Sequence, residues 1–263
     1  MDLLIISNYW HFINEKSSSR YNTIAEMALR AGCNVEVVTS SFYHTKKQQR
    51  NRTDIVSEYP FTLVKEPNYK KNVSIKRIIS HRKFAKGVEE YLKTREKPDV
   101  IYLFVPPTGL AKRVVRFANK NNIRVIIDVL DLWPEAFEMV LPKFAQPLLF
   151  PIKRSAEYVY KNADDIVAVS KAYVEKVKSY NKKYSEALPV YIGTDLTVFD
   201  DYAKGAVDLD DKIRPITMAY IGMFGKSYDL IFAMQALKEL IEEGFDKIEF
   251  LVMGSGPMRE EFE

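Results

Sequence analysis

Two apolar runs decide the fold of this chain: VIYLFV at Val100–Val105 and RVIIDV at Arg124–Val129. Both are apolar almost throughout rather than alternating with polar residues, as expected for strands of a parallel sheet that are buried on both faces. An amphipathic helical pattern lies between them. A strand, a helix and a second strand in this order predict a doubly wound parallel α/β sheet.

The alternation of strands and helices continues in both directions along the chain. In the first helical segment, Ser17–Ser19 supplies candidate N-caps and Gly32 a candidate C-cap. The predicted apolar face of this helix consists of Ile24, Met27, Ala28 and Ala31. The other predicted strands are Leu3–Ser7, Val35–Thr39, Thr62–Val64, Ile166–Ser170, Leu188–Ile192, Ile216–Ile221 and Ile248–Met253.

A break in composition divides the chain into two parts. Aspartates crowd a stretch with little apolar content, at Asp200, Asp201, Asp208, Asp210 and Asp211. We interpret residues 200–214 as a linker between a complete Rossmann-like domain at residues 1–199 and a second one at residues 215–263. A parallel α/β domain needs roughly 100 residues or more, so the second domain is expected to be only partial here.

The composition is that of a soluble globular protein, with 47% hydrophobic and 28% charged residues. The single cysteine, Cys33, excludes an internal disulfide and favours a reducing compartment. The start of the chain lacks the basic region and the apolar core of a signal peptide. No stretch approaches the roughly 18 apolar residues of a membrane-spanning helix. We therefore expect a cytoplasmic protein.

Positive charge is concentrated between Ser41 and Pro98. There 15 Lys and Arg stand against 6 Asp and Glu, a local net charge of +9 in a chain whose total is +4. Such a segment favours anionic partners, among them phospholipid head groups, a phosphorylated acceptor or nucleic acid. The alternative interpretation is that these charges form the solvated faces of two surface helices and a loop.

The most informative residues directly follow predicted strands. Ligands of open parallel sheets bind at the carboxyl ends of the strands, so these loops predict a binding crevice. The loop sequences are Pro106-Pro107-Thr108-Gly109, Asp131-Leu132-Trp133-Pro134-Glu135, Gly222-Met223-Phe224-Gly225-Lys226-Ser227-Tyr228-Asp229 and Gly254-Ser255-Gly256-Pro257.

In their order and spacing, these loops resemble the GT-B glycosyltransferases of retaining family four, in particular the bacterial branch that builds capsule, O-antigen or exopolysaccharide. The segments Ala163–Ser170 and Tyr191–Asp195 resemble family segments in the same order. There are three departures. Ser17-Ser18-Ser19-Arg20 stands where a glycine pair is usual, Met223 replaces a basic residue, and the paired-glutamate motif that holds the donor sugar and ribose would lie beyond Glu263.

The resemblance implies roles for the loop residues. Asp131 would orient the acceptor hydroxyl or the donor sugar, beside the cleft residues Pro107, Gly109, Trp133 and Glu135. The donor diphosphate would be held by Gly222, Gly225, Lys226, Gly254 and Gly256. The alternatives are structural: the glycines would make tight turns, Trp133 would be a packing anchor, and Pro134 with Glu135 would start a helix.

The resulting hypothesis is a retaining glycosyltransferase that moves a sugar, such as a hexose or acetamidosugar, from a nucleotide-sugar to a lipid-linked glycan acceptor at the inner membrane face. Membrane docking is assigned to Lys65, Lys70, Lys71, Lys76, Arg77, Arg82, Lys83 and Lys86. No nucleic acid partner is expected. The competing hypothesis is a truncated, non-catalytic fragment that binds only acceptor or anionic membrane. The residues at 1–263 would transfer no sugar alone, because the glutamate pair is missing.

Neither a metal nor a cofactor is expected. The histidines His11, His44 and His81 have no metal-ligand spacing with one another or with Cys33. Asp208-Leu209-Asp210 imitates the Asp-x-Asp metal motif of another glycosyltransferase architecture, but it lies in the predicted linker rather than at the end of a strand. No Gly-x-Gly-x-x-Gly follows the first strand, which argues against a dinucleotide-binding oxidoreductase.

Overall fold

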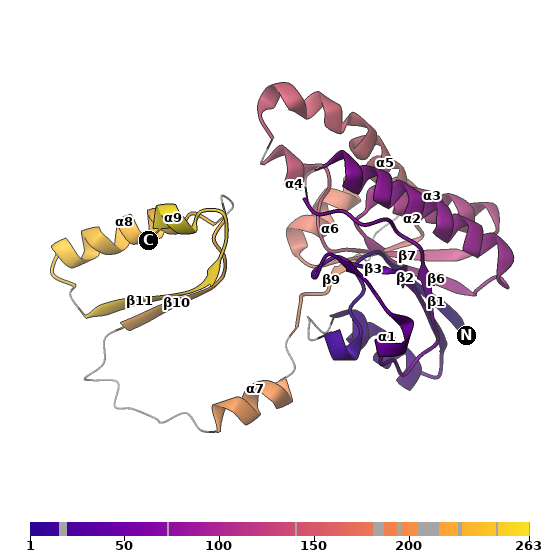
Figure 1. Cartoon of the computed structure of the whole chain (residues 1–263), viewed down its shortest axis with the longest axis horizontal. Helices are drawn as coiled ribbons and strands as arrows, with labels where there is room; N and C mark the ends of the chain where they lie inside the picture. Colours follow the sequence, from indigo (N-terminus) through magenta and orange to yellow (C-terminus); the bar gives the residue numbers. More distant parts are fainter. Residues whose placement is uncertain are drawn as a thin grey trace. The chain divides into compact units, whose positions relative to one another are not determined.

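The computed structural model describes residues 1–15, 20–72, 74–139, 141–180, 187–193, 196–204, 216–225, 228–245 and 247–262. The chain forms two compact units, Met1–Asp195 and Leu196–Glu263 (Figure 1). The first unit contains a seven-stranded sheet and a small hairpin, and the second contains a two-stranded sheet.

The main sheet of the first unit is parallel throughout and has the strand order β5-β2-β1-β6-β7-β8-β9. The chain builds outward from β1 in one direction and then returns to build outward from β6 in the other. The order therefore reverses between β1 and β6, which is where open parallel sheets place their ligand crevice. The strands are β1 Asp2–Ser7, β2 Asn34–Ser40, β5 Phe61–Val64, β6 Val100–Val105, β7 Arg124–Val129, β8 Asp165–Ala168 and β9 Leu188–Pro189.

Helices cover both faces of this sheet. Helix α1 (Arg20–Arg30) packs on one face, whereas α2 (Ile75–Thr94), α3 (Thr108–Lys120) and α5 (Phe150–Asn162) contribute to the core on the other. The remaining elements are η1 Ile13–Glu15, the hairpin strands β3 Phe42–Tyr43 and β4 Gln48–Gln49, η2 Arg52–Asp54, α4 Glu135–Glu138, η3 Lys143–Leu149 and α6 Lys171–Lys178. The sequence had not predicted the hairpin.

The central strands supply side chains to two cores at once. In β6, Ile101 and Leu103 belong to the core under α2 and α3, whereas Tyr102 and Phe104 face the core under α1. Since successive strand residues point to opposite faces, a strand covered on both sides must be apolar at nearly every position. This explains why the predicted limits of β6 are confirmed to the residue. The predicted limits of β7 are confirmed as well, although its first residue, Arg124, is exposed.

The second unit consists of α7 Leu196–Ala203, β10 Ile216–Met223, α8 Leu230–Glu242, β11 Ile248–Ser255 and α9 Arg259–Phe262. Strands β10 and β11 pair in parallel, with Gly222 opposite Gly254. The Asp229 side chain accepts a hydrogen bond of 2.9 Å from the Phe232 amide and so caps the start of α8. The expected linker at residues 200–214 begins inside α7, and its residues 205–214 lie outside the described residues.

Several predicted boundaries differ from the structure. The strand predicted at Ile166–Ser170 ends at Ala168, because the Ser170 side chain accepts a hydrogen bond from the Tyr173 amide and caps α6. The strand predicted at Leu188–Ile192 contains only its first two residues. Conversely, β10 and β11 each extend two residues past the predicted end.

The predicted apolar face of the first helix is only partly right. Met27 is 64% exposed, and the fully buried apolar residue of α1 is Ala25, which shows that the helix is rotated relative to the prediction. The C-cap at Gly32 is confirmed: its φ is +79°, and the next amide bonds to the Ala28 carbonyl. The N-caps predicted at Ser17–Ser19 lie outside the described residues.

No described helix is long and apolar enough to cross a membrane. Within the described ranges, no three His, Cys, Asp or Glu side chains are grouped in a way that could hold a metal ion.

Candidate functional site

Side chains from several elements meet beyond the carboxyl ends of β1, β2, β5 and β7. Hydrogen bonds and ring contacts connect most of them, and the group of Asn8, Glu66 and Ser80 adjoins these through the electrostatic interaction of Glu66 with Arg77. We call the whole set the crevice cluster. Its members are Asn8, Tyr9, His44, Lys47, Glu66, Tyr69, Arg77, Ser80, His81, Asp131 and Trp133. Because the strand order reverses beside β1, this cluster lies at the edge where the topology places a ligand site.

A buried carboxylate, Glu66, joins the base of the cluster. Asn8 donates to one carboxylate oxygen and Ser80 to the other, each at 2.7 Å. Glu66 is only 2% exposed, and its burial raises the pKa of its carboxyl group. These bonds link the loops after β1 and β5 to helix α2. They leave the amide oxygen of Asn8 buried and without a partner among the described residues.

The Tyr9 hydroxyl connects the Arg77 guanidinium to the His81 imidazole. Arg77 Nη2 donates to the Tyr9 hydroxyl at 2.8 Å, and that hydroxyl lies 3.2 Å from His81 Nε2. Burial raises the pKa of Tyr9 to about 12. Burial and then the nearby Arg77 charge lower the pKa of His81 to about 3. Tyr9 and His81 are therefore both neutral at pH 7, and Arg77 carries the positive charge.

The predicted catalytic residue Asp131 lies in this cluster, next to Trp133. The indole Nε1 of Trp133 donates to Asp131 Oδ2 at 3.0 Å, and burial raises the pKa of the Asp131 carboxyl group. Trp133 is 9% exposed and stacks on His81, with ring centroids 6.3 Å apart. Trp133 therefore packs against its neighbours, as the structural interpretation of this residue predicts. It also lies beside the residues of the predicted cleft.

The other predicted cleft residues differ in their surroundings. Glu135 forms an ion pair of 2.9 Å with Lys176 of α6, so its carboxylate is engaged in holding α4 to α6 rather than in the crevice cluster. Pro107 is buried immediately before α3, and Gly109 is exposed in the first turn of that helix. Neither belongs to the network of contacts that defines the cluster.

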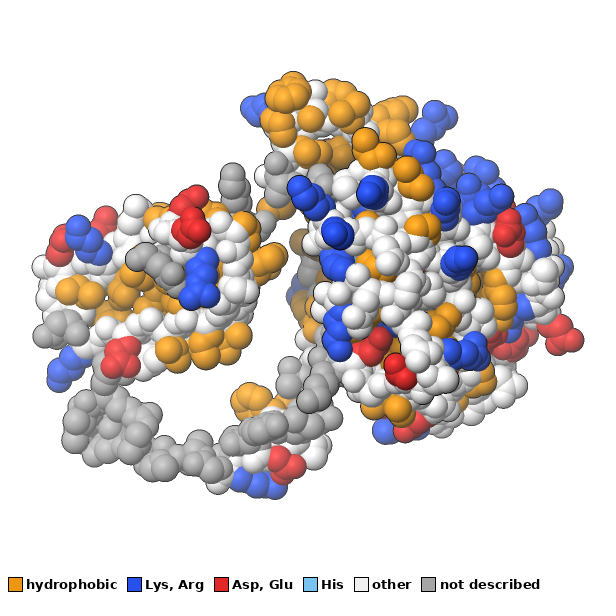
Figure 2. Space-filling view, viewed as in Figure 1, with side chains coloured by type: hydrophobic (Ala, Val, Ile, Leu, Met, Phe, Trp, Pro, Cys, Tyr) orange, Lys and Arg blue, Asp and Glu red, His pale blue; other side chains and the backbone are white. Residues whose placement is uncertain are grey.

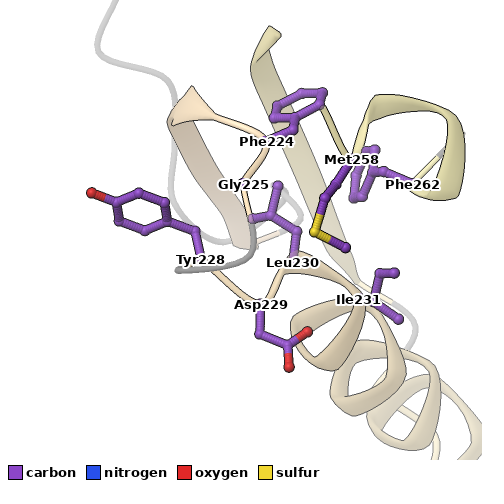
Figure 3. A pocket seen from close by; sticks show the side chains of 8 residues that line it. All are labelled: Phe224, Gly225, Tyr228, Asp229, Leu230, Ile231, Met258 and Phe262. Carbon is purple, nitrogen blue, oxygen red and sulfur yellow. The ribbon is translucent and has the colours of Figure 1, made fainter. Parts of the chain in front are cut away.

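The predicted donor loops of the second unit border a cavity of about 170 Å³ at the carboxyl ends of β10 and β11 (Figure 3). Phe224, Met258 and Phe262 gather at one side of it, with the two phenylalanine rings 5.4 Å apart. The complete lining is Phe224, Gly225, Tyr228, Asp229, Leu230, Ile231, Met258 and Phe262. Lys226, the predicted diphosphate ligand, lies outside the described residues.

Packing accounts for two of the donor-loop glycines. A Cβ atom on Gly254 would lie 1.8 Å from the Gly222 carbonyl oxygen, and one on Gly256 would lie 2.2 Å from the Phe224 carbonyl oxygen. A Cβ on Gly222 would meet only the Tyr220 side chain, at 2.7 Å. The backbones of β10 and β11 therefore approach too closely for a side chain at residues 254 and 256. At Gly225, by contrast, nothing lies closer than 3.9 Å.

This difference gives a test of the two interpretations of the glycines. We expect Gly256→Ala to lower the unfolding midpoint of the second unit strongly, because the methyl group collides with a backbone oxygen. Gly225→Ala is expected to leave that midpoint close to wild type and to weaken nucleotide diphosphate binding by blocking backbone approach. Hydrogen exchange in β10 and β11 and UDP titration measure the two effects. Equal destabilisation by both substitutions would contradict the assignment.

A separate buried pair braces the other face of β7. Asp128 is completely buried and accepts two hydrogen bonds from Arg20, at 3.0 Å from Nε and 2.9 Å from Nη2. Tyr102 donates to the same carboxylate at 2.8 Å. The remaining Arg20 nitrogen, Nη1, donates to the carbonyls of Val190 and Tyr191 at 2.8 and 3.3 Å. The pair thus joins α1, β6, β7 and the segment after β9.

The residues assigned to membrane docking do not all share one environment. Arg77 is only partly exposed, and its guanidinium is engaged in the crevice cluster, so we reassign it to that site. The others are exposed: Lys65, Lys70, Lys71, Lys76, Arg82, Lys83 and Lys86. Isoleucines are interspersed with them at the start of α2, where Ile75 is 76% exposed and Ile78 and Ile79 are about half exposed.

A second exposed apolar set lies on the segment that joins α4 to α5. Its members include Phe144, which is 87% exposed, together with Met139, Leu148 and Phe150. Figure 2 shows apolar side chains gathered over this projecting segment, with basic side chains nearby. Burying apolar surface from water is favourable. A group of large exposed apolar side chains therefore marks a contact surface more often than single scattered ones do.

No family model and no curated protein matches the chain. Solved structures do resemble it. Sucrose-phosphate synthase from Thermosynechococcus elongatus has a TM-score of 0.52 at 12% identity, over 96% of this chain and 70% of that protein. Arabidopsis thaliana UGT89C1 complexed with quercetin has 0.50 at 11%, over 97% and 73%. A UGT transferase from Siraitia grosvenorii in complex with UDP has 0.50 at 12%, over 97% and 73%.

These similarities confirm the predicted GT-B-like α/β fold. At such low identity they concern the fold alone. The chain spans 66 to 73% of the length of the solved structures that it resembles. The retaining mechanism, the sugar class and the lipid-linked acceptor stay predictions.

Proposed function

We propose that this chain belongs to a glycosyltransferase that takes a sugar from a nucleotide-sugar donor and passes it, with retention at the anomeric carbon, to a lipid-linked glycan acceptor. The observation that carries the proposal is the crevice cluster at the strand-order reversal of a GT-B-like first unit. The similar solved structures support it, since one is a sucrose-phosphate synthase and another is a transferase bound to UDP. No metal or cofactor is assigned a role.

The proposed chemistry divides between the two units. When the glycosidic bond of the donor breaks, negative charge grows on the leaving nucleotide diphosphate. The Lys226 cation and the N-terminus of α8 would stabilise that charge, and the open backbone at Gly225 would allow close approach. In the first unit, Asp131 would orient the acceptor hydroxyl, with its own position fixed by Trp133.

Asp131→Asn tests the role of the first unit. We expect slower transfer of a radiolabelled sugar from nucleotide-sugars to a lipid extract, measured with the product of the complete reading frame. UDP affinity is expected to stay near wild type, because the nucleotide is assigned to the other unit. Asp165→Asn, at a partly exposed position on the neighbouring strand β8, is the matched control. Transfer at the wild-type rate in Asp131→Asn would remove this residue from the mechanism.

We propose further that the first unit docks on the inner membrane face, which would place the protein at the cytoplasmic surface where a lipid-linked acceptor is presented. The exposed lysines beside α2 supply positive charge for anionic lipid, and the isoleucines among them supply apolar contact. The exposed apolar set between α4 and α5 adds a second apolar contact.

Vesicle binding tests this docking. We expect the chain to sediment with vesicles containing phosphatidylglycerol and to be released as salt rises, because exposed charges are screened. Changing Lys70 and Lys71 together to Glu should reduce binding. Changing the exposed Lys238 and Lys247 of the second unit to Glu is the charge-matched control. Binding that is independent of salt, or equally reduced in both double variants, would contradict docking through the basic segment.

A further inference from the structure

A lysine stands in the turn of the β3–β4 hairpin where the backbone favours glycine. Lys47 has a φ of +55°, in the left-handed region that side chains with a Cβ rarely adopt. Hairpin turns commonly place glycine in this conformation. A strained residue of this kind persists only when the surrounding structure holds it, and such residues concentrate at functional sites. The contacts of the Lys47 side chain are therefore expected to show what holds this backbone conformation.

That side chain is held by Asn72 and by two other members of the crevice cluster. Lys47 Nζ donates to Asn72 Oδ1 at 2.6 Å and lies 3.1 Å from His44 Nδ1. It also lies 4.9 Å from the centre of the Tyr69 ring. These contacts fix the position of the ammonium group without neutralising its charge, because Asn, His and Tyr are uncharged partners here.

A second cation shares the same supports. Arg77 Nη1 donates to the backbone carbonyl of Asn72 at 2.7 Å, and its guanidinium lies 5.7 Å from the Tyr69 ring centre and 5.5 Å from that of Trp133. Neither Lys47 nor Arg77 forms an ion pair with a described carboxylate. The nearby acid Glu66 accepts hydrogen bonds from Asn8 and Ser80 and acts on Arg77 through its charge.

The charges of Lys47 and Arg77 repel each other, although Glu66 also interacts electrostatically with Arg77. Burial, and after it the Arg77 charge, lowers the pKa of Lys47. Burial, and after it the charges of Lys47 and Arg77, lowers the pKa of His44 to about 4. Removing this repulsion requires negative charge between them. A phosphate group suits the arrangement because guanidinium binds its oxygens in pairs and ammonium adds a compact charge.

We propose that Lys47 and Arg77, positioned by Asn72 and Tyr69, form a subsite for the phosphate or diphosphate ester of the acceptor. This inference deepens the proposed function and rests on it for the identity of the ester. The subsite lies in the first unit, apart from the nucleotide diphosphate assigned to the second. Neutral Tyr9, His44 and His81 beside it offer hydrogen bonds to ester oxygens without adding charge.

Lys47→Gly is the decisive variant, because glycine adopts φ +55° without strain while removing the ammonium group. We expect its unfolding midpoint to stay close to wild type and its affinity for inorganic pyrophosphate, measured by calorimetry at fixed ionic strength, to fall by about 10-fold or more. Arg77→Gln should lose affinity similarly. Lys46→Gly in the same turn and Lys93→Gln on the same helix are matched controls expected to bind as wild type.

Three further arms identify the source of the phosphate. Geranylgeranyl diphosphate should compete with pyrophosphate, whereas acetate at equal ionic strength should not. Phosphatidylglycerol vesicles should still bind Lys47→Gly, since docking is assigned to other lysines. Vesicle binding lost in Lys47→Gly would reassign the two cations to a lipid head group and overturn the acceptor subsite.

Pyrophosphate affinity that is equal in wild type and Lys47→Gly, or absent in wild type, would also overturn the subsite. A different result would overturn the proposed function alone. Pyrophosphate binding would then depend on Lys47 and Arg77 as expected, but the product of the complete reading frame would transfer no sugar.

Discussion

Asp128→Asn is expected to lower the free energy of unfolding of the first unit by about 3–5 kcal/mol. The substitution keeps the shape of the side chain but removes the charge that faces Arg20, which would then be an unpaired cation in a buried site. Asp128 is fully buried and its bonds to Arg20 are bidentate, so water cannot replace the lost partner.

Both tryptophans of the chain, Trp10 and Trp133, lie in the first unit, so their fluorescence during urea unfolding reports on that unit alone. Arg124→Gln is the matched control, because its pair with Asp165 is exposed and such pairs contribute about 0–1 kcal/mol. Replacing Arg20 and Asp128 together with Met and Leu should recover much of the loss, since no charge is left unpaired. A loss in Asp128→Asn no larger than in the control would show that the pair is not a brace.

Lys226→Ala is expected to lower the turnover number of the complete enzyme by roughly 10²–10³-fold, the effect of losing one preorganised partner of a developing negative charge. This expectation rests on the proposed function. The lysine would act on the leaving diphosphate, so the loss should appear in kcat rather than in stability. Lys238→Ala, on the exposed side of α8, is the control. An unchanged rate in Lys226→Ala would remove the phosphate role while leaving the acceptor crevice untouched.

Burial on both faces made the central strands predictable from sequence. In β6, every residue is apolar, so the run begins and ends with the strand itself. The edge strand β9 is different: it has one neighbour and only two residues, and the apolar run around it does not mark its end. The limits of a strand follow from sequence only where packing constrains every position.

The candidate site was predictable only in part, for a related reason. Asp131 and Trp133 directly follow a strand, so the general rule for parallel sheets finds them. Glu66, His81 and Lys47 reach the crevice through the pairing of β5 with β2, through α2 and through a hairpin turn, and no local pattern shows this. One available signal was helical spacing: Arg77 lies on the same face of α2 as Ser80, His81 and the buried Phe84, which separates it from its exposed neighbours.

The glycines of the donor loops show that one sequence pattern can have two physical reasons. Glycine after a strand is equally consistent with a phosphate loop and with two backbones in close contact. At Gly254 and Gly256 the structure supplies the second reason, through the carbonyls of Gly222 and Phe224. Gly225 has no such neighbour, so it is the glycine of this group whose lack of a side chain packing does not explain.

The bonds from Arg20 to the carbonyls of Val190 and Tyr191 have a consequence for protein engineering. They tie the first helix of the unit to almost its last described residues. A shortened protein that stops before Val190 would leave a buried guanidinium N–H without an acceptor, at a site that already contains a buried charge. Any separate expression of the first unit should therefore retain the chain through Tyr191, and a circular permutation that opens the chain at this point would place its new ends at the brace itself.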